Sequence, residues 1–151
     1  MDIEHELSDI FADVTIDVIS TVSGFSLTVQ SQEKDKRLEA ITGFMNLNGK
    51  KGGTLFMSAK ESDIRVLCSY MTGAPQAEIT EDDIEDAVCE LVNMIAGGVK
   101  LRLSDTDYMF NITQPFAITG ENVSIVTKKR AHVISSTLGN EEISVKLRVV
   151  Y

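Results

Sequence analysis

The sequence predicts an α+β fold in which helices pack on a largely antiparallel sheet. Helical spacing of apolar residues dominates residues 3–23, 62–71 and 81–103, whereas most of the alternating, strand-like segments follow residue 107. Helices early in a chain and strands clustered late are typical of α+β domains. With 151 residues, of which 43% are hydrophobic and 25% charged, we expect a single domain that spans residues 1–151.

The first third of the chain predicts one helix followed by three strands. The helix should end near Ser23, because Gly24 suits the C-terminal cap. A charged loop over residues 31–37 separates the first strand from the second, and Asn48-Gly49 opens a turn that makes the last two strands an antiparallel hairpin. The apolar helix positions are Ile3, Leu7, Ile10, Phe11, Val14 and Val18, and the three strands are Phe25–Gln30, Leu38–Asn48 and Thr54–Ala59.

A second, shorter helix and a run of late strands complete the expected elements. Ser62 or Asp63 is the expected N-cap of the helix, which runs to Met71, and Gly73 ends it before a loop at Pro75. Its inward face consists of Ile64, Leu67, Cys68 and Met71. The late strands are Tyr108–Thr113, Phe116–Thr119, Val123–Lys128, His132–Leu138 and Ile143–Tyr151.

The third helix has the strongest local signals. Thr80 is the expected N-cap and Asp83 stands where the acid of a capping box belongs. Glu81, Asp82 and Glu85 add negative charge near the helix start, where the helix dipole favours it. Its buried stripe is formed by Ile84, Ala87, Val88, Leu91, Ile95 and Val99.

Opposite this stripe, four residues share an exposed ridge. Asp86, Glu90, Asn93 and Gly97 follow one another in steps of four, three and four, which places them on one side of a helix. A solvated helix face is the simplest interpretation. However, Asn and Gly are poor choices for a surface helix; Gly costs about 1 kcal/mol relative to Ala. Gly97 permits close approach of another backbone, and the Asn93 amide can orient a water molecule, so the ridge is a candidate contact site.

Composition excludes several classes of function. A net charge of −9 argues against a nucleic-acid partner, and the basic cluster Lys128-Lys129-Arg130 is interpreted as a solvated turn. No apolar run is long enough to cross a bilayer, and the acidic start of the chain does not resemble an export signal, so we expect a cytoplasmic protein with no membrane partner. Cys68 and Cys89 lack metal-ligand spacing and are expected to be free thiols; no metal site is predicted.

A three-residue sequence that occurs twice suggests a possible internal pseudo-repeat. Ile41-Thr42-Gly43 recurs 77 residues later as Ile118-Thr119-Gly120, and the same offset places the third helix on the first. Asp86 and Glu90 then correspond to Asp9 and Asp13, but Asn93 corresponds to Ile16. A second active site on the first helix is therefore not expected.

The ridge resembles a family motif, that of the CheC/CheX/FliY chemotaxis phosphatases, and in particular the single-site CheX type. That pattern has an Asp or Ser, a Glu and an Asn on one helix and a Pro further on, which this chain supplies as Asp86, Glu90, Asn93 and Pro115. The run Glu90–Lys100 is also similar to the family's. Over residues 38–127 the further matches are Ile41-Thr42-Gly43, Gly52-Gly53-Thr54-Leu55, Tyr70-Met71-Thr72-Gly73 and Gly120.

The resemblance implies a two-layer CheC-like/CheX-like fold and hydrolysis of the phosphoryl-aspartate of a CheY-like response regulator. It implies that Glu90 forms a salt bridge with the regulator's active-site lysine. Asn93 suits the orientation of the attacking water, since an amide donates and accepts without adding charge. Asp86 and Gly97 would bind the partner, and Pro115 would be structural. The protein would need no cofactor of its own, because Mg²⁺ belongs to the regulator.

Two further expectations follow from the resemblance. The similar proteins often dimerise by joining sheets, and the alternation of Val145, Leu147 and Val149 would make a plausible edge strand for a homodimer, although a covered edge would have the same pattern. Cys89 stands where the family often has a small residue. The alternative functions are a non-catalytic module that binds a receiver domain or a flagellar or signalling protein, and a plain structural domain.

Overall fold

A computed structural model of the chain describes residues 3–128 and 131–151. In these residues it has three α-helices, α1 (Ile3–Ser23), α2 (Glu61–Thr72) and α3 (Glu81–Leu103), and one short 3₁₀ turn, η1 (Gln76–Glu78). The strands are β1 (Thr28–Ser31), β2 (Ile41–Asn48), β3 (Gly53–Ala59), β4 (Asn111–Ile112), β5 (Phe116–Thr119), β6 (Val133–Gly139) and β7 (Ser144–Val150). The predicted α+β class is confirmed.

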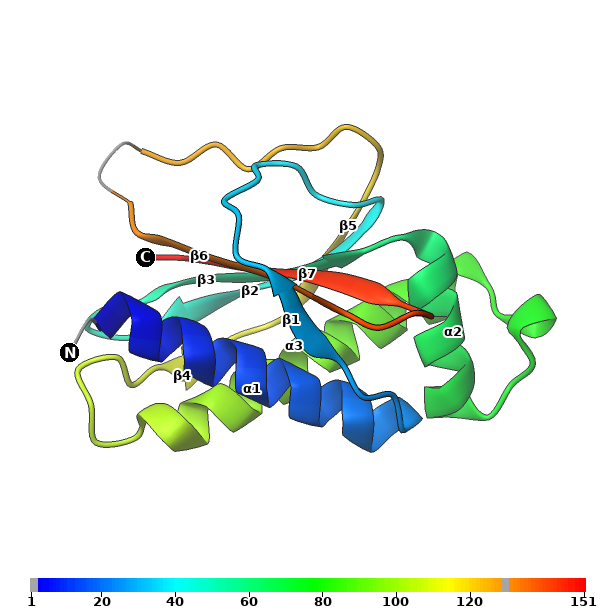
Figure 1. The fold of residues 1–151 in the computed structure, drawn as a ribbon, viewed down its shortest axis with the longest axis horizontal. Helices are drawn as coiled ribbons and strands as arrows, with labels where there is room; N and C mark the ends of the chain where they lie inside the picture. Colours follow the sequence, from blue (N-terminus) through cyan, green and yellow to red (C-terminus); the bar gives the residue numbers. More distant parts are fainter. Residues whose placement is uncertain (1–2, 129–130) are drawn as a thin grey trace.

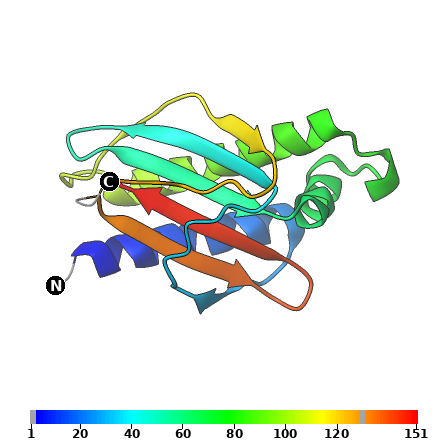
Figure 2. The same cartoon turned by 90° about the horizontal axis from the view of Figure 1, so that it is seen from above.

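All strand pairs are antiparallel and belong to one sheet. The order across the sheet is β1-β6-β7-β3-β2, after which β4 and β5 both pair with the outer side of β2 (Figure 2). The predicted hairpin is present, with Ile41 opposite Ala59 and Leu47 opposite Gly53. The edges of the described sheet are therefore β1 on one side and the β4–β5 segment on the other.

The fold has two layers. Helices α1 and α3 lie side by side against one face of the sheet, with α2 at one end (Figure 1). Strand residues alternate, so that Ile41, Met45 and Leu47 of β2 face the helices and are buried. Segments 32–40 and 120–128 pass over the opposite face of the sheet (Figure 1). The core thus lies between the helices and the sheet, and this layer positions α3.

Two glycines allow α3 to pack closely. A Cβ at Gly43 of β2 would lie 2.8 Å from the carbonyl oxygen of Val88, so α3 rests almost directly on the sheet backbone there. A Cβ at Gly98 would lie 2.6 Å from Cγ1 of Val14 in α1. Helix α3 is therefore held against the sheet and against α1 by contacts that a larger side chain would obstruct.

The start of α2 differs from the prediction. The N-cap is Lys60, not Ser62 or Asp63, and its side chain makes no capping hydrogen bond. Asp63 lies inside the helix, where its Oδ2 accepts a hydrogen bond from the backbone N–H of Ser144 at 3.2 Å. A tertiary contact with the start of β7 thus occupies the carboxylate that would have capped the helix. At the other end, Gly73 takes the predicted left-handed cap conformation, with φ 75°.

Several predicted strands are shorter than expected. The strand predicted at Phe25–Gln30 is β1, which covers Thr28–Ser31, and Tyr108–Thr113 contributes only the two residues of β4. Val123–Lys128 is not a strand: within the described residues it makes one isolated bridge, from Ser124 to Arg37. This segment crosses over the sheet and bonds to a loop, which explains its extended, alternating sequence. Lys129 and Arg130 of the basic cluster lie outside the described residues.

The C-terminal strand is not the edge that we expected. β7 lies between β6 and β3, so Val145, Leu147 and Val149 pack inward against the helices and are buried. Their alternation reflects a central strand with one covered face.

The two copies of the Ile-Thr-Gly sequence are neighbours in space. Strand β5 pairs with β2, with Ile41 opposite Thr119 and Thr42 opposite Ile118. The offset of 77 residues also places α1 on α3, but it places α2 on β7, a strand. The possible pseudo-repeat therefore does not extend to α2.

Candidate functional site

The start of α3 has the predicted capping box. The N–H of Asp83 donates to Oγ1 of Thr80 at 3.2 Å, and the N–H of Thr80 donates to Oδ2 of Asp83 at 2.9 Å. The predicted inward stripe is buried, and Val92 and Ala96 extend it. Both findings fix the rotation of α3, which is the property that decides which residues face outward.

The ridge of α3, defined as Asp86, Glu90, Asn93 and Gly97, faces away from the core. Asp86 and Glu90 are exposed, whereas Asn93 and Gly97 are half-buried, so the fully exposed ridge that we expected is correct only for its first half. Its second half is partly covered because the β4 segment packs along α3. A Cβ at Gly97 would lie 4.0 Å from Cδ1 of Ile112 in β4.

Glu90 and Asn93 are one helical turn apart, and neither side chain has a hydrogen bond or ion pair with another described residue. Positions three apart are neighbours on a helix surface. The site therefore presents one carboxylate and one half-buried amide, side by side and unengaged. A carboxylate can hold a cation, and the amide can donate to one atom while it accepts from another.

The two glycines at the end of the ridge have different surroundings. The space next to Gly97 is open apart from Ile112, whereas Gly98 faces Val14. Gly97 therefore is not required for packing, and its lack of a side chain leaves the ridge accessible beside Asn93. Sequence reasoning did not identify Ile112, which is 39% exposed, as a neighbour of the ridge. The alternating sequence around Ile112 predicts a strand but does not indicate which helix that strand contacts.

Pro115 connects β4 to β5 and is half-buried. It immediately precedes β5, which begins at Phe116. Its fixed φ suits this strand entry, and it has no side-chain group that could bind or transfer a proton. This position agrees with the structural role that we expected.

Both cysteines are free thiols, as predicted. Cys68 is buried, and Cys89 is half-buried next to the ridge. Burial raises the pKa of the Cys89 thiol, and the carboxylates of Asp86 and Glu85 raise it further. A thiol with a raised pKa stays protonated and is a poor nucleophile, so Cys89 has no evident chemical role in the site.

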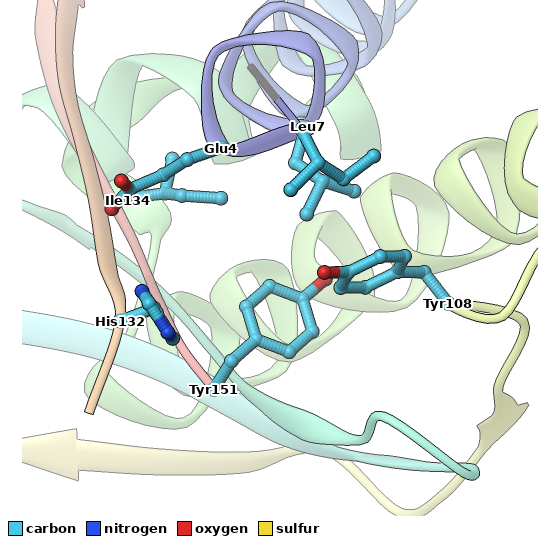
Figure 3. A pocket seen from close by; sticks show the side chains of 7 residues that line it. Glu4, Leu7, Tyr108, His132, Ile134 and Tyr151 are labelled. Carbon is cyan, nitrogen blue, oxygen red and sulfur yellow. The ribbon is translucent and has the colours of Figure 1, made fainter. Parts of the chain in front are cut away.

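A separate hollow lies at the start of α1 and contains none of the ridge residues (Figure 3). It is lined mainly by apolar groups, with the rings of Tyr108 and Tyr151 in edge contact at 5.5 Å between centroids. The hydroxyl of Tyr151 is buried and has no hydrogen-bond partner in the described part of the chain. Burial raises the pKa of this hydroxyl well above its ordinary value. Glu4 and His132 also line the hollow, so its polar groups come from four residues, none of which belongs to the ridge.

No helix among residues 3–128 and 131–151 is long and apolar enough to cross a membrane. The same residues contain no cluster of three or more His, Cys, Asp and Glu side chains suited to a metal ion.

The fold is similar to that of several solved chemotaxis proteins. CheX from Vibrio vulnificus matches with a TM-score of 0.82 and 19% identity, over 95% of this chain and 97% of that one. CheX from Desulfovibrio desulfuricans also has a TM-score of 0.82, with 21% identity over 95% and 97% of the two chains. CheX from Borrelia burgdorferi, solved as a CheX-CheY-BeF₃-Mg²⁺ complex, has a TM-score of 0.78 and 16% identity over 94% and 96%. These likenesses establish the two-layer CheC-like/CheX-like fold.

The family is established by the sequence itself. The family model described as "Chemotaxis phosphatase CheX" matches residues 41–138, from the first residue of β2 into β6, a span that contains the whole of α3. No curated protein sequence matches the chain significantly. The chain belongs to the CheX family of chemotaxis phosphatases.

Proposed function

We propose that this protein hydrolyses the aspartyl phosphate of a CheY-like response regulator with Glu90 and Asn93 of α3. The observation that carries the proposal is the unengaged carboxylate and amide, one turn apart, on the outward face of a helix that the family match includes. The Borrelia burgdorferi CheX of the same fold was solved with CheY, which supports a regulator of this type as the partner. Chemotaxis or a related two-component pathway is the expected setting.

Asn93 is proposed to orient the water that attacks phosphorus. An acyl phosphate is already activated, so catalysis requires mainly an aligned nucleophile and compensation of spreading charge. The amide can accept a hydrogen bond from the water and donate to a phosphoryl oxygen, and it adds no negative charge. Its half-buried position restricts its rotamers, which lowers the entropic cost of holding the water.

Glu90 is proposed to anchor the regulator by a salt bridge to its active-site lysine. A carboxylate would repel the phosphoryl group if it stood in the place of Asn93, but one turn earlier it can hold the lysine and so orient the amide. Asp86 and Gly97 extend the contact at either end. Asp86 adds negative charge, and Gly97 leaves room for the partner's backbone.

The remaining parts of the proposal concern cofactor, assembly and location. We propose that the protein uses no cofactor of its own, that the required Mg²⁺ is held by the regulator's acidic pocket, and that the reaction takes place in the cytoplasm. A homodimer is also proposed. Because β7 is a central strand, a sheet-joining dimer would use β1 or the β4–β5 segment, and sedimentation analysis would establish whether it forms.

The test is the decay of a phosphorylated CheY-like regulator from the same organism in the presence of Mg²⁺. Four samples are compared: no addition, wild type, Asn93→Ala, and Asn48→Ala as a matched loss of an exposed amide outside α3. We expect wild type and Asn48→Ala to accelerate decay equally, and Asn93→Ala to leave decay at the rate without addition. Circular dichroism would confirm that each variant is folded.

Two other outcomes would change the assignment. Full activity of Asn93→Ala would exclude the proposed role of the amide. If no sample accelerates decay while wild type binds the phosphorylated regulator in a titration, the non-catalytic receiver-binding module becomes the better interpretation.

A further inference from the structure

The outer face of the sheet, opposite the helices, carries a row of side chains that is aromatic at one end and polar at the other. Cross-strand pairing aligns Phe116, Phe44, Phe56, Arg148 and Ser135 on β5, β2, β3, β7 and β6. The ring of Phe44 lies between the other two, with its centroid 5.4 Å from that of Phe116 and 5.8 Å from that of Phe56. Phe116 is 52% exposed, whereas Arg148 is only 3% exposed. The loops over the outer face thus cover the polar end of the row (Figure 1).

Arg148 is a buried cation with few partners. It donates one hydrogen bond from Nη1 to Oγ of Ser135, and its Nε has no partner in the described part of the chain. Burial lowers the pKa of the guanidinium, which means that the protein disfavours its charge. A charged group that is buried without a directly paired counter-ion destabilises the fold. A bound anion would remove this cost.

The acid nearest to Arg148 is already engaged. Asp35 accepts a hydrogen bond from the backbone N–H of Arg37 at 3.0 Å, and its carboxylate forms an ion pair with Lys146 at 3.4 Å. Lys146 also pairs with Glu39 at 3.2 Å. No ion pair joins Asp35 to Arg148 among the described residues, although the carboxylate does favour the guanidinium's charge.

A cavity of about 200 Å³ lies beside Arg148, between the loops and the sheet. Lys34 and Lys36 line it with Arg148 and Asp35. Lys34 also pairs with Glu4 of α1 at 3.6 Å, so Lys36 and Arg148 supply most of the positive charge that faces the cavity, in a protein whose net charge is −9. Its remaining walls are mostly apolar and include Ile125, Val133 and Val150. This combination suits an anionic group on a small apolar body, because guanidinium binds oxyanions through directed N–H donors.

We infer that this cavity is a binding site for a small organic oxyanion, a carboxylate or phosphate monoester, whose charged group meets Arg148 while its body contacts Val133 and Val150. The site is distinct from the ridge of α3, which lies on the other layer, and the inference does not depend on the proposed phosphatase activity. Lys34 and Lys36 at the rim attract the anion and contribute less than the buried Arg148.

The test uses three probes at constant ionic strength: benzoate, phenyl phosphate and inorganic phosphate. At a tenfold excess over Kd we expect benzoate or phenyl phosphate to raise the Tm of the wild-type protein by about 3–5 °C. Calorimetric titration should give one site per chain. The aromatic probes should exceed inorganic phosphate, since only they use the apolar walls.

Variants locate the site. Arg148→Met should weaken binding at least about tenfold, because it removes the charge-assisted hydrogen bonds from the guanidinium to the anion. Its Tm without anion should equal or exceed that of wild type, since the buried charge is removed. Should Arg148→Met not fold, Lys34→Ala combined with Lys36→Ala leaves the buried row intact and should still weaken binding severalfold. Lys50→Ala is the matched control, because Lys50 lies in the β2–β3 turn and is well exposed.

Three outcomes would overturn the inference. The first is no rise in Tm with any probe up to about 20 mM, the weakest binding that such a site would support. The second is a Kd that is the same in wild type and in the lysine double variant. The third is a response to inorganic phosphate as large as that to the aromatic probes, which would show that the apolar walls do not select a ligand.

Discussion

Gly43 of β2 and Val92 of α3 are so close that a Cβ on the glycine would lie 2.6 Å from Cγ2 of the valine. The carbonyl oxygen of Val88 would be 2.8 Å away, and backbone cannot move aside as a side-chain end can. We expect Gly43→Ala to lower the free energy of unfolding by about 1–3 kcal/mol, as overpacking does. Urea unfolding with an unchanged m-value would measure it. A stability within error of wild type would mean that the helix can shift without cost.

The adjacent glycines of α3 should respond in opposite ways. Gly97→Ala meets only Ile112 at 4.0 Å, so it should preserve stability or raise it by up to about 1 kcal/mol through helix propensity. Gly98→Ala meets Val14 and should be less stable than Gly97→Ala by about 1–3 kcal/mol. If the ridge contacts the regulator, Gly97→Ala alone should raise the KM for the phosphorylated regulator at an unchanged kcat. An unchanged KM would remove Gly97 from the contact surface.

Local signals explain which features could be predicted from the sequence. The capping box of α3, its buried stripe and the Gly73 cap depend on neighbours in the chain, and all three are confirmed. Asp63 failed as a cap because its partner, Ser144, is 81 residues away. The central position of β7 and the contact of Ile112 with the ridge could not be predicted for the same reason. Alternation shows which residues share a face of a strand, but not which elements lie next to that strand.

Reversal of the charge at Glu90 should affect the partner more than the fold. Glu90 is exposed and has no ion pair among the described residues, so Glu90→Lys should change the free energy of unfolding by less than about 0.5 kcal/mol. If Glu90 pairs with the regulator's active-site lysine as proposed, repulsion between the two lysines should lower kcat/KM by at least about tenfold. Glu142→Lys, in the exposed β6–β7 turn, is the control for net charge. Equal losses in the two variants would assign the effect to overall charge.

The capping box should stabilise α3 without taking part in the reaction. Thr80→Ala removes the acceptor for the N–H of Asp83 and should cost about 0.5–2 kcal/mol. Asp83→Ala removes the reciprocal bond, and the two losses should be less than additive in a double-mutant cycle, because each bond orders the other's residue. The kcat/KM should stay at the wild-type value at temperatures where the variants are folded. A strictly additive cycle would argue that the two hydrogen bonds form independently.

The reactivity of Cys89 should report the electrostatics of the ridge. Burial, then Asp86 and Glu85, raise the pKa of this thiol above its ordinary value. The thiolate fraction at pH 8 should therefore be smaller than that of a free cysteine, and alkylation by iodoacetamide correspondingly slower. Because the folded-state pKa is the higher one, the thiol's contribution to stability is present below the unfolded-state pKa. It is lost as the pH rises from there through the folded-state pKa, since the unfolded state releases its proton first.

Asp86→Asn removes one of the negative charges, so alkylation of Cys89 at a fixed pH should become faster, whereas Cys68, which is buried, should change less. Rates measured by mass spectrometry between about pH 7 and 10 would show this as a shift of the Cys89 curve to lower pH. A curve that does not move would mean that burial and Glu85 set the pKa and that the Asp86 carboxylate does not act on the thiol.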